Sequence, residues 1–269
     1  MPYPYCIFWH ERVMSVSQFI FYPINRSPVL AAAGEALKRK GYGVVAHPCE
    51  SVRYLLLPVP SFDDQGNLKG GGDLNAALSK LPKSVTIIGG NLPKDRFPGY
   101  KTIDLLKDPT YLADNAAITA YCAVRLAMME LPVMLRGCQV LIIGWGRIGR
   151  CLAALLWAME ADVTIAARSE EQRAMAHALG YQAEDTALLG HNLNGYRLIF
   201  NTAPAPVLSE EQVSHCRDNC LKIDLASTLG IAGTHVIWAR GLPGKDAPES
   251  SGKLIAKTAI RLIEKEKVQ

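Results

Sequence analysis

The stretch VLIIGWGRIG, residues 140–149, decides the fold expected for the second half of this chain. Four apolar residues lead into the pattern Gly-x-Gly-x-x-Gly, and an Ala- and Leu-rich stretch follows it. A strand, a glycine turn and a helix in that order are typical of a Rossmann dinucleotide-binding unit. The alternative is a purely structural glycine turn in an α/β protein that binds no nucleotide. The strand before the turn and the helix after it favour nucleotide binding.

Each glycine of this turn has a separate role in such a unit. Gly144 permits the tight turn, Gly146 lets the backbone approach a pyrophosphate, and Gly149 lets the helix pack close to the strand. The helix that begins here offers free N–H groups and a partial positive charge to phosphates. The residues expected to contact the cofactor at the turn are Gly144, Trp145, Gly146, Arg147, Ile148 and Gly149.

The next predicted strand, 163–167, ends at the position that distinguishes NAD from NADP. An NAD-specific site places Asp or Glu about 20 residues after the glycine turn, where it binds the ribose 2′-hydroxyl. Here Ala167 is followed by Arg168 and Ser169. A guanidinium binds a 2′-phosphate through paired charge-assisted hydrogen bonds, whereas a carboxylate would repel it. The sequence thus predicts NADP, held by these three residues; the alternative is an exposed arginine with no ligand.

Strands and helices alternate along the chain, which predicts an α/β fold with two domains. We expect an N-terminal α/β domain at 1–113, a linking helix at 114–132 and a doubly wound, parallel-sheet Rossmann domain at 133–250. A C-terminal helix, 251–269, is expected to pack back on the first domain. The predicted strands cover residues 17–22, 52–59, 84–88, 139–143, 163–167, 197–201, 221–225 and 235–239. The predicted helices cover residues 30–40, 73–81, 111–132, 147–159, 169–179 and 251–266.

Loops at the carboxyl ends of parallel strands are where doubly wound sheets bind their ligands. Two such loops are predicted to complete the cofactor site. Their residues are Asn201, Thr202, Ala203, Pro204, Asp224, Leu225 and Ala226. Asp224 lies inside an apolar strand, so its carboxylate is either a satisfied structural group or part of the site. For 201–206 the alternative is a plain loop ended by prolines.

The same geometry predicts a substrate site in a cleft between the two domains. An anionic substrate needs N–H donors or cations, which the glycine-containing loop at 241–245 and the start of the last helix can supply. The residues expected to bind substrate are Thr119, Ser227, Leu242, Pro243, Gly244 and Lys245. No histidine stands in a recognisable base motif, and no G-x-S-x-G or Cys-His nucleophile pattern occurs. The catalytic residue therefore stays unassigned.

Composition limits the classes of protein to which this chain can belong. The net charge is +4, without a run of Lys or Arg typical of nucleic-acid binding, and no apolar run is long enough to span a membrane. The 7 scattered cysteines predict reduced thiols in the cytoplasm, not a disulfide framework. His215, Cys216 and Cys220 lack a fourth ligand, so no metal site is expected. The amino terminus lacks signal-peptide features, and Met14 is an alternative start.

Five segments together resemble the A-type subunit of bacterial dipicolinate synthase. They are VLIIGWGRIGR (140–150), VTIAARS (163–169), IFNTAPAPVL (199–208), KIDLAS (222–227) and ARGLPGKDAPESSGKLIA (239–256). A weaker likeness covers LLLPVPSFDDQGNL (55–68). The resemblance implies a two-domain oxidoreductase subunit that uses NADP in the last step to dipicolinate, the pyridine dicarboxylate made during sporulation. It also implies a second, flavoprotein-like subunit in the enzyme, and we further expect a homo-oligomer.

The chain departs from that family on the substrate side. Residues 22–26 (YPINR) stand where the family has a glycine-rich turn followed by Arg, and 118–122 (ITAYC) keep only Thr119 of a Pro-Thr-x-Glu-Gly pattern. Glu249 replaces a lysine. We expect a divergent NADP-dependent oxidoreductase that transfers hydride between NADP and dihydrodipicolinate or a related small cyclic carboxylate. The alternative is a non-catalytic NADP-binding sensor or regulatory subunit.

Overall fold

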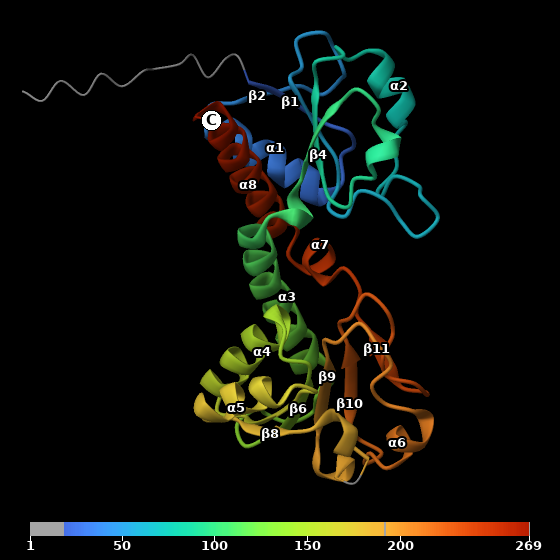
Figure 1. Cartoon of the computed structure of the whole chain (residues 1–269), viewed down its shortest axis with the longest axis vertical. Helices are drawn as coiled ribbons and strands as arrows, with labels where there is room; N and C mark the ends of the chain where they lie inside the picture. The colour runs from blue at the N-terminus through green and yellow to red at the C-terminus, as the bar shows by residue number, and fades with distance from the viewer. Residues whose placement is uncertain (1–18, 191, 269) are drawn as a thin grey trace, which may run out of the picture. The chain divides into compact units, whose positions relative to one another are not determined.

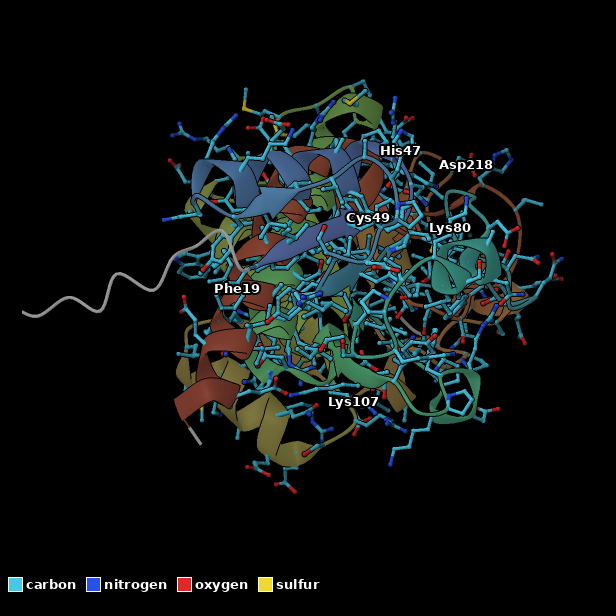
Figure 2. The ribbon with its side chains drawn as sticks, turned by 90° about the horizontal axis from the view of Figure 1, so that it is seen from above. Phe19, His47, Cys49, Lys80, Lys107 and Asp218 are labelled. Atoms are coloured by element: carbon cyan, nitrogen blue, oxygen red, sulfur yellow. The ribbon has the colours of Figure 1, made fainter. Side chains whose placement is uncertain are left out.

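The computed structural model describes residues 19–190 and 192–268, and the chain forms two compact units. Unit 1 combines the residues up to Leu106 with those from Ala256 onward, and unit 2 is Lys107–Ile255. Figure 1 shows the course of the chain, and Lys107 is labelled in Figure 2. The domain boundaries expected from the sequence stay a prediction. Met14 and the first residues of the strand predicted at 17–22 lie outside the described residues.

Unit 1 is built on a parallel sheet of five strands in the order β2-β1-β3-β4-β5. Its strands are β1 (Ile20–Pro23), β2 (Gly43–Val44), β3 (Tyr54–Leu56), β4 (Thr86–Gly89) and β5 (Lys101–Asp104). Its helices are α1 (Pro28–Arg39), α2 (Leu74–Ser79) and the later part of α8 (Pro248–Val268). Strand β4 is buried along its whole length, as expected of a parallel strand covered on both faces.

Unit 2 contains a parallel sheet of six strands in the order β11-β10-β9-β6-β7-β8. Its strands are β6 (Gln139–Ile143), β7 (Asp162–Ala166), β8 (Gln182–Glu184), β9 (Leu198–Asn201), β10 (Leu221–Asp224) and β11 (Val236–Trp238). Its helices are α3 (Pro109–Glu130), α4 (Arg147–Ala158), α5 (Glu170–Ala178), α6 (Glu210–Ser214) and α7 (Leu242–Asp246). The strand order reverses beside β6, as in doubly wound dinucleotide-binding folds. The predicted fold class is confirmed.

Alternate residues of β6 belong to different cores on the two faces of this sheet. Val140 and Ile142 pack in one cluster with residues of α3, α4 and α5. Leu141 and Ile143 pack in another, with residues that follow β8 and β9. Helices therefore cover one face, and shorter segments cover the other. Burial on both faces explains why the strand reads as a continuous apolar run.

The parallel register brings the ends of four strands of unit 2 together. Ile143 at the end of β6 pairs with Ala166 of β7 and with Asn201 of β9. Asn201 pairs in turn with Asp224, the last residue of β10. The segments that follow these strands are therefore neighbours along one edge of the sheet. This is the edge where ligands bind in doubly wound folds.

Some elements of the structure depart from those expected. Strands β2, β5 and β8 are two to four residues long and were not predicted, because so short a segment carries little periodicity. The strand predicted at 52–59 is limited to Tyr54–Leu56, since Pro58 and Pro60 have no N–H for a ladder bond. Among the described residues, no helix combines the length and the apolarity needed to cross a bilayer.

Candidate functional site

The glycine turn needs glycine at two of its positions for different reasons. Gly144 has a φ of +106°, and a Cβ there would lie 2.5 Å from Thr202 Oγ1. A Cβ on Gly149 would collide with the carbonyl oxygen of Gly144. Thr202 Oγ1 donates hydrogen bonds to the carbonyls of Ile143 (3.1 Å) and Gly144 (3.3 Å). The turn, the start of α4 and the loop after β9 are thus packed tightly together.

Gly146 differs from these two glycines because it faces open space. It is exposed, and a Cβ there would meet nothing within 4 Å. It is also the N-cap of α4 and provides no side-chain cap, so the first N–H groups of the helix lack intrahelical partners. Arg147 beside it is exposed, and Ile148 is half-buried. The backbone here offers room and unpaired donors to a pyrophosphate.

The indole of Trp145 is used for packing. Trp145 is 3% exposed, and its ring meets that of Tyr181 edge-on, with 5.6 Å between the centroids. Arg150 donates from Nε to the Trp145 carbonyl at 3.2 Å, and its guanidinium lies 5.7 Å from the indole centroid. Among the described residues, Trp145 Nε1 is buried without a hydrogen-bond partner. The sequence predicts that Trp145 contacts the cofactor. Because its indole is buried, only its backbone is available for that contact.

The loop after β7 presents the residues expected to bind a 2′-phosphate. Ala167 is buried, whereas Arg168 and Ser169 are exposed. Ser169 is the N-cap of α5, where its hydroxyl accepts a hydrogen bond from the Gln172 N–H at 3.4 Å. The strand passes into this loop with no carboxylate at its end.

Arg173 fixes the loop, and the sequence alone did not reveal it. Its Nη1 donates to the carbonyls of Ala167 and Arg168, each at 2.8 Å, and pairs with Asp185 Oδ2 at 2.8 Å. These contacts hold the backbone of Arg168 while its own guanidinium stays exposed. One signal was available: an arginine four residues after the Ser169 cap lies early in α5, where a long side chain can reach back to the strand end.

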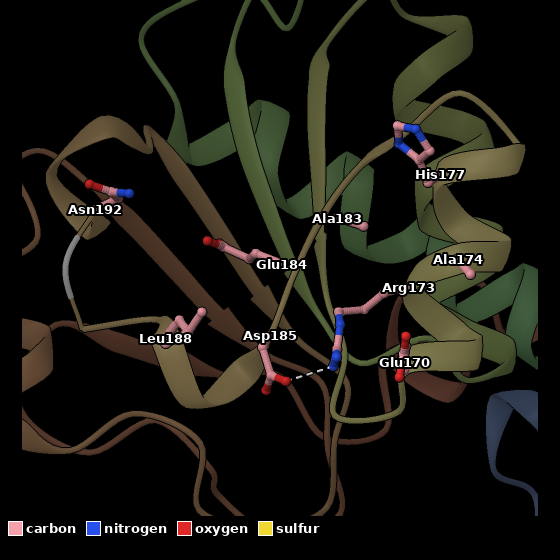
Figure 3. Close-up of a pocket in the computed structure, with 9 residues that line it drawn as sticks. All are labelled: Glu170, Arg173, Ala174, His177, Ala183, Glu184, Asp185, Leu188 and Asn192. Carbon is pink, nitrogen blue, oxygen red and sulfur yellow. Dashed lines mark ion pairs between the residues drawn. The ribbon is translucent and has the colours of Figure 1, made fainter.

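A groove of about 820 Å³ lies between α5 and β8 (Figure 3). Glu170 and Arg173 line it from α5, and Glu184 and Asp185 line it from β8 and the residue after it. Burial raises the pKa of Glu184, whose Oε1 accepts a hydrogen bond from the Tyr196 hydroxyl at 3.1 Å. Carboxyl groups predominate, and Arg173 is already paired with Asp185. The groove therefore does not suit a phosphate.

Asp224 is fully buried and fully hydrogen-bonded. Its Oδ1 accepts from the Ala226 N–H (2.9 Å), and its Oδ2 accepts from the N–H groups of Gly230 (2.7 Å) and Ile231 (3.1 Å). Asn201 Nδ2 donates to the same Oδ2 at 3.0 Å. Of the two interpretations open from the sequence, these bonds favour the satisfied structural group. Asp224 shapes the loop after β10 and ties it to the end of β9.

The remaining residues of these two loops are placed unequally. The Ala203 N–H donates to Asn201 Oδ1 at 2.9 Å, and Pro204 after it is exposed. Leu225 packs in the core with α3 and α4. Ala226 is buried, and its carbonyl accepts a hydrogen bond from Trp238 Nε1 at 3.0 Å. The loop after β9 thus presents more surface to a ligand than the first residues after β10.

Thr119, expected to face the substrate, is buried in α3. Its hydroxyl donates to the carbonyl of Asn115, one turn earlier in the same helix, at 2.8 Å. Helix α3 packs against α7 in unit 2, where Arg125 Nη1 donates to the Asp246 carbonyl at 3.3 Å. Thr119 therefore lies on a helix that contacts the α7 segment, with its hydroxyl already used.

The other residues expected to bind substrate follow β10 or form α7. Ser227 is exposed in the loop after β10. Leu242 is buried, and the carbonyl of Pro243 accepts a hydrogen bond from Ser251 Oγ at 2.8 Å. Gly244 and Lys245 are exposed. The structure thus offers a hydroxyl, a backbone segment and one ammonium group from this set.

The sequence has a recognisable relative among characterised proteins. It is 27% identical over 171 residues to the A-type subunit of dipicolinate synthase from Bacillus subtilis (strain 168), a match that covers 61% of this chain and 58% of that protein. This chain is a homologue of that dipicolinate synthase subunit. The resemblance noted in the five sequence segments is confirmed. No protein-family model matches the sequence.

Solved structures share the fold of the chain. The A-type subunit of dipicolinate synthase from Bacillus halodurans is 18% identical, with a TM-score of 0.79 over 92% of this chain and 98% of that one. A transhydrogenase from Sinorhizobium meliloti is 14% identical, with a TM-score of 0.69 over 92% of this chain and 94% of that one. At these identities the two structures show a shared fold.

Proposed function

We propose that this chain is an NADP-dependent oxidoreductase subunit of the dipicolinate synthase type. One observation carries the proposal: Arg168 and Ser169 are exposed directly after β7, with no carboxylate, in the sheet whose glycine turn offers space at Gly146. This arrangement fits a dinucleotide that carries a 2′-phosphate. The relation to dipicolinate synthase supports the class of reaction.

The proposed cofactor contacts follow from the chemistry of each group. Gly146 and the first turn of α4 receive the pyrophosphate. Arg168 binds the 2′-phosphate, and the Ser169 hydroxyl, which already accepts one hydrogen bond, can still donate one. Arg173 holds the carbonyls that set the position of Arg168. Residues 202–204 form the wall beside the nicotinamide. NADP supplies hydride transfer when bound.

The proposed substrate is dihydrodipicolinate or a related small cyclic carboxylate. The exposed Lys245 ammonium and the backbone at Gly244 are suited to carboxylate groups, and Ser227 adds an exposed hydroxyl. Resemblance to the family supports a flavoprotein-like protein as the second subunit of the enzyme. A homo-oligomer in the cytoplasm is part of the same proposal.

Two measurements test this function. Titration with NADPH and NADH should show tighter NADPH binding, and equal or tighter binding of NADH would contradict the cofactor assignment. Substrate-dependent turnover of NADP(H), with and without the flavoprotein-like protein, should be lost in Gly244→Val while NADPH binding is kept. Unchanged turnover in Gly244→Val would place the substrate elsewhere. The matched control is Gly195→Val, because Gly195 is exposed, has room for a Cβ and lies outside the proposed site.

A second function, a non-catalytic NADP-binding sensor, is favoured by one observation. The hydroxyl of Thr119, the residue kept from the family pattern in α3, is bound by its own helix. Lys245 is then the one cation among the residues proposed to bind substrate. The sensor predicts NADPH binding that changes with dicarboxylates but no turnover with any of them, even with the flavoprotein-like protein present.

A further inference from the structure

Unit 2 has a second pocket at the opposite edge of its sheet from the glycine turn. Its volume is about 460 Å³, and it lies where β6 and β9 begin and just before β10. The lining residues on which the argument rests are Val133, Met134, Arg136, Arg197, Arg217 and Asn219. The strands are four to five residues long, so about 15 Å of sheet separates this pocket from the proposed cofactor site. The dinucleotide therefore does not account for it.

The described residues that line the pocket include three arginines and no carboxylate. Arg217 is held in place, since its Nε donates to the Asn194 carbonyl at 3.0 Å and its Nη2 donates to the Gly195 carbonyl. Arg136 is exposed and pairs with Glu160 at 2.7 Å. These two side chains already have protein partners for part of their donor sets.

Arg197 is different because a buried donor of its guanidinium is unsatisfied. Within the described residues, Arg197 Nε is shielded from solvent and has no hydrogen-bond partner. A buried donor on a charged group without a partner is costly. Arg197 is also one of the residues that line the pocket.

The acidic groups near the pocket are not among the side chains that bind Arg197. Burial raises the pKa of the Cys138 thiol, although Arg197 and Arg217 oppose the shift, so the thiol stays neutral. The carboxylate of Asp162 accepts a hydrogen bond from Gln139 Nε2 at 2.7 Å. Asp218, labelled in Figure 2, is exposed and is not among the residues that line the pocket.

We propose that this pocket binds a small organic oxyanion, a carboxylate or a phosphate monoester, through Arg197 and Arg217. A guanidinium fork matches both oxyanions in geometry. Val133 and Met134, which are 47% and 73% exposed, border the pocket and suit an apolar portion of the ligand. The volume is that of a small-molecule site.

Calorimetric titration of the full chain with benzoate and with phenyl phosphate, at constant ionic strength, tests the proposal. Both probes carry a phenyl group, so they differ only in the oxyanion. We expect saturable binding of at least one probe, weakened about tenfold or more in Arg197→Gln. Binding should be unchanged in Arg39→Gln, which removes an exposed charge in α1, and in Arg168→Gln, which alters the proposed cofactor site. If both probes bind, the pocket recognises the oxyanion chemistry that they share. If one binds, the pocket is specific for the carboxylate or for the phosphate monoester.

Two results of these titrations would overturn the proposal. One is no saturable binding of either probe, and the other is equal affinity in Arg197→Gln, whether or not Arg168→Gln loses binding. Arg197→Lys keeps the charge but not the planar fork, and should bind with intermediate affinity. It gives a second readout if Arg197→Gln does not fold, since wild-type affinity in Arg197→Lys would also exclude the guanidinium contact. Hydrogen exchange gives a further test. If neither probe slows exchange in segment 133–139 and only a bound protein does, the small-molecule assignment fails.

Discussion

Arg168 is exposed at the end of β7, with its backbone held by Arg173. We expect Arg168→Ala to weaken NADPH binding about ten- to a hundredfold, since a charge-assisted contact contributes about 1.5–3 kcal/mol. NADH has no 2′-phosphate, so its affinity should not fall. Fluorescence titration of both cofactors measures the difference. Arg39→Ala is the matched control, and an equal loss of NADH affinity in Arg168→Ala would refute the role given to Arg168.

Gly149 and Gly146 have different functions in the same turn, and alanine at each position separates them. A Cβ on Gly149 meets the Gly144 carbonyl oxygen, whereas a Cβ on Gly146 meets nothing within 4 Å. We expect Gly149→Ala to lower the free energy of unfolding of unit 2 by about 1–3 kcal/mol. Gly146→Ala should fold with nearly unchanged stability but bind the dinucleotide more weakly. Urea unfolding and NADPH titration check the pair; similar destabilisation in both variants would be inconsistent with this division.

At the scale of elements, the buried carboxylate of Asp224 connects the ends of β9 and β10. It accepts three backbone N–H bonds and one from Asn201. We expect Asp224→Ala to lower the free energy of unfolding by about 3 kcal/mol or more, since it leaves several buried donors unpaired. Asp218→Ala, at an exposed position nearby in sequence, should have little effect. Chemical denaturation measures both, and a small loss in Asp224→Ala would show that water replaces the carboxylate.

Strand β8 contains an acid whose burial makes stability depend on pH. Burial raises the pKa of Glu184, so the native state holds this proton more tightly than the unfolded state does. The resulting stabilisation is complete below the ordinary glutamate pKa and is lost as pH rises through the raised value. Glu184→Gln can still accept the Tyr196 bond, so the variant should gain stability over wild type from mildly acidic to neutral pH. Thermal unfolding across that range tests this, with exposed Glu130→Gln as control; a constant difference would contradict it.

The elements differ in how well the sequence predicts them, for physical reasons. Strand β6 is a buried parallel strand before a glycine turn, and both its bounds agree with the prediction. Strand β8 is three residues long and lies at the sheet edge, so it carries no clear hydrophobic pattern. The loop contact of Arg173 and the bonds of Asp224 depend on tertiary structure. Residue type alone cannot show that the side chain of Arg168 is exposed, whereas that of Arg173 is hydrogen-bonded to the backbone of the loop.

At the scale of the molecule, unit 1 depends on the far end of the chain. The later part of α8 buries Ala259 and Ile263, and Glu266 Oε2 pairs with Lys101 Nζ at 2.7 Å. We expect removal of residues 256–269 to unfold unit 1 and leave unit 2 folded. Hydrogen exchange should show loss of protection in β3 and β4 with retention in β6 and β9. Ile263→Ala is the milder variant, at a cost of about 2–5 kcal/mol to unit 1; full protection of β4 in the truncated chain would contradict the expectation.

The division of the chain also has a consequence for its biosynthesis. Unit 2 is inserted into the chain of unit 1, which resumes at Ala256. A ribosome adds about 5–20 residues per second, so the segment Lys107–Ile255 takes on the order of ten seconds to emerge. Throughout that time the five-stranded sheet lacks the helix that completes its core. The unit whose strands are all made first is therefore the unit that is completed last.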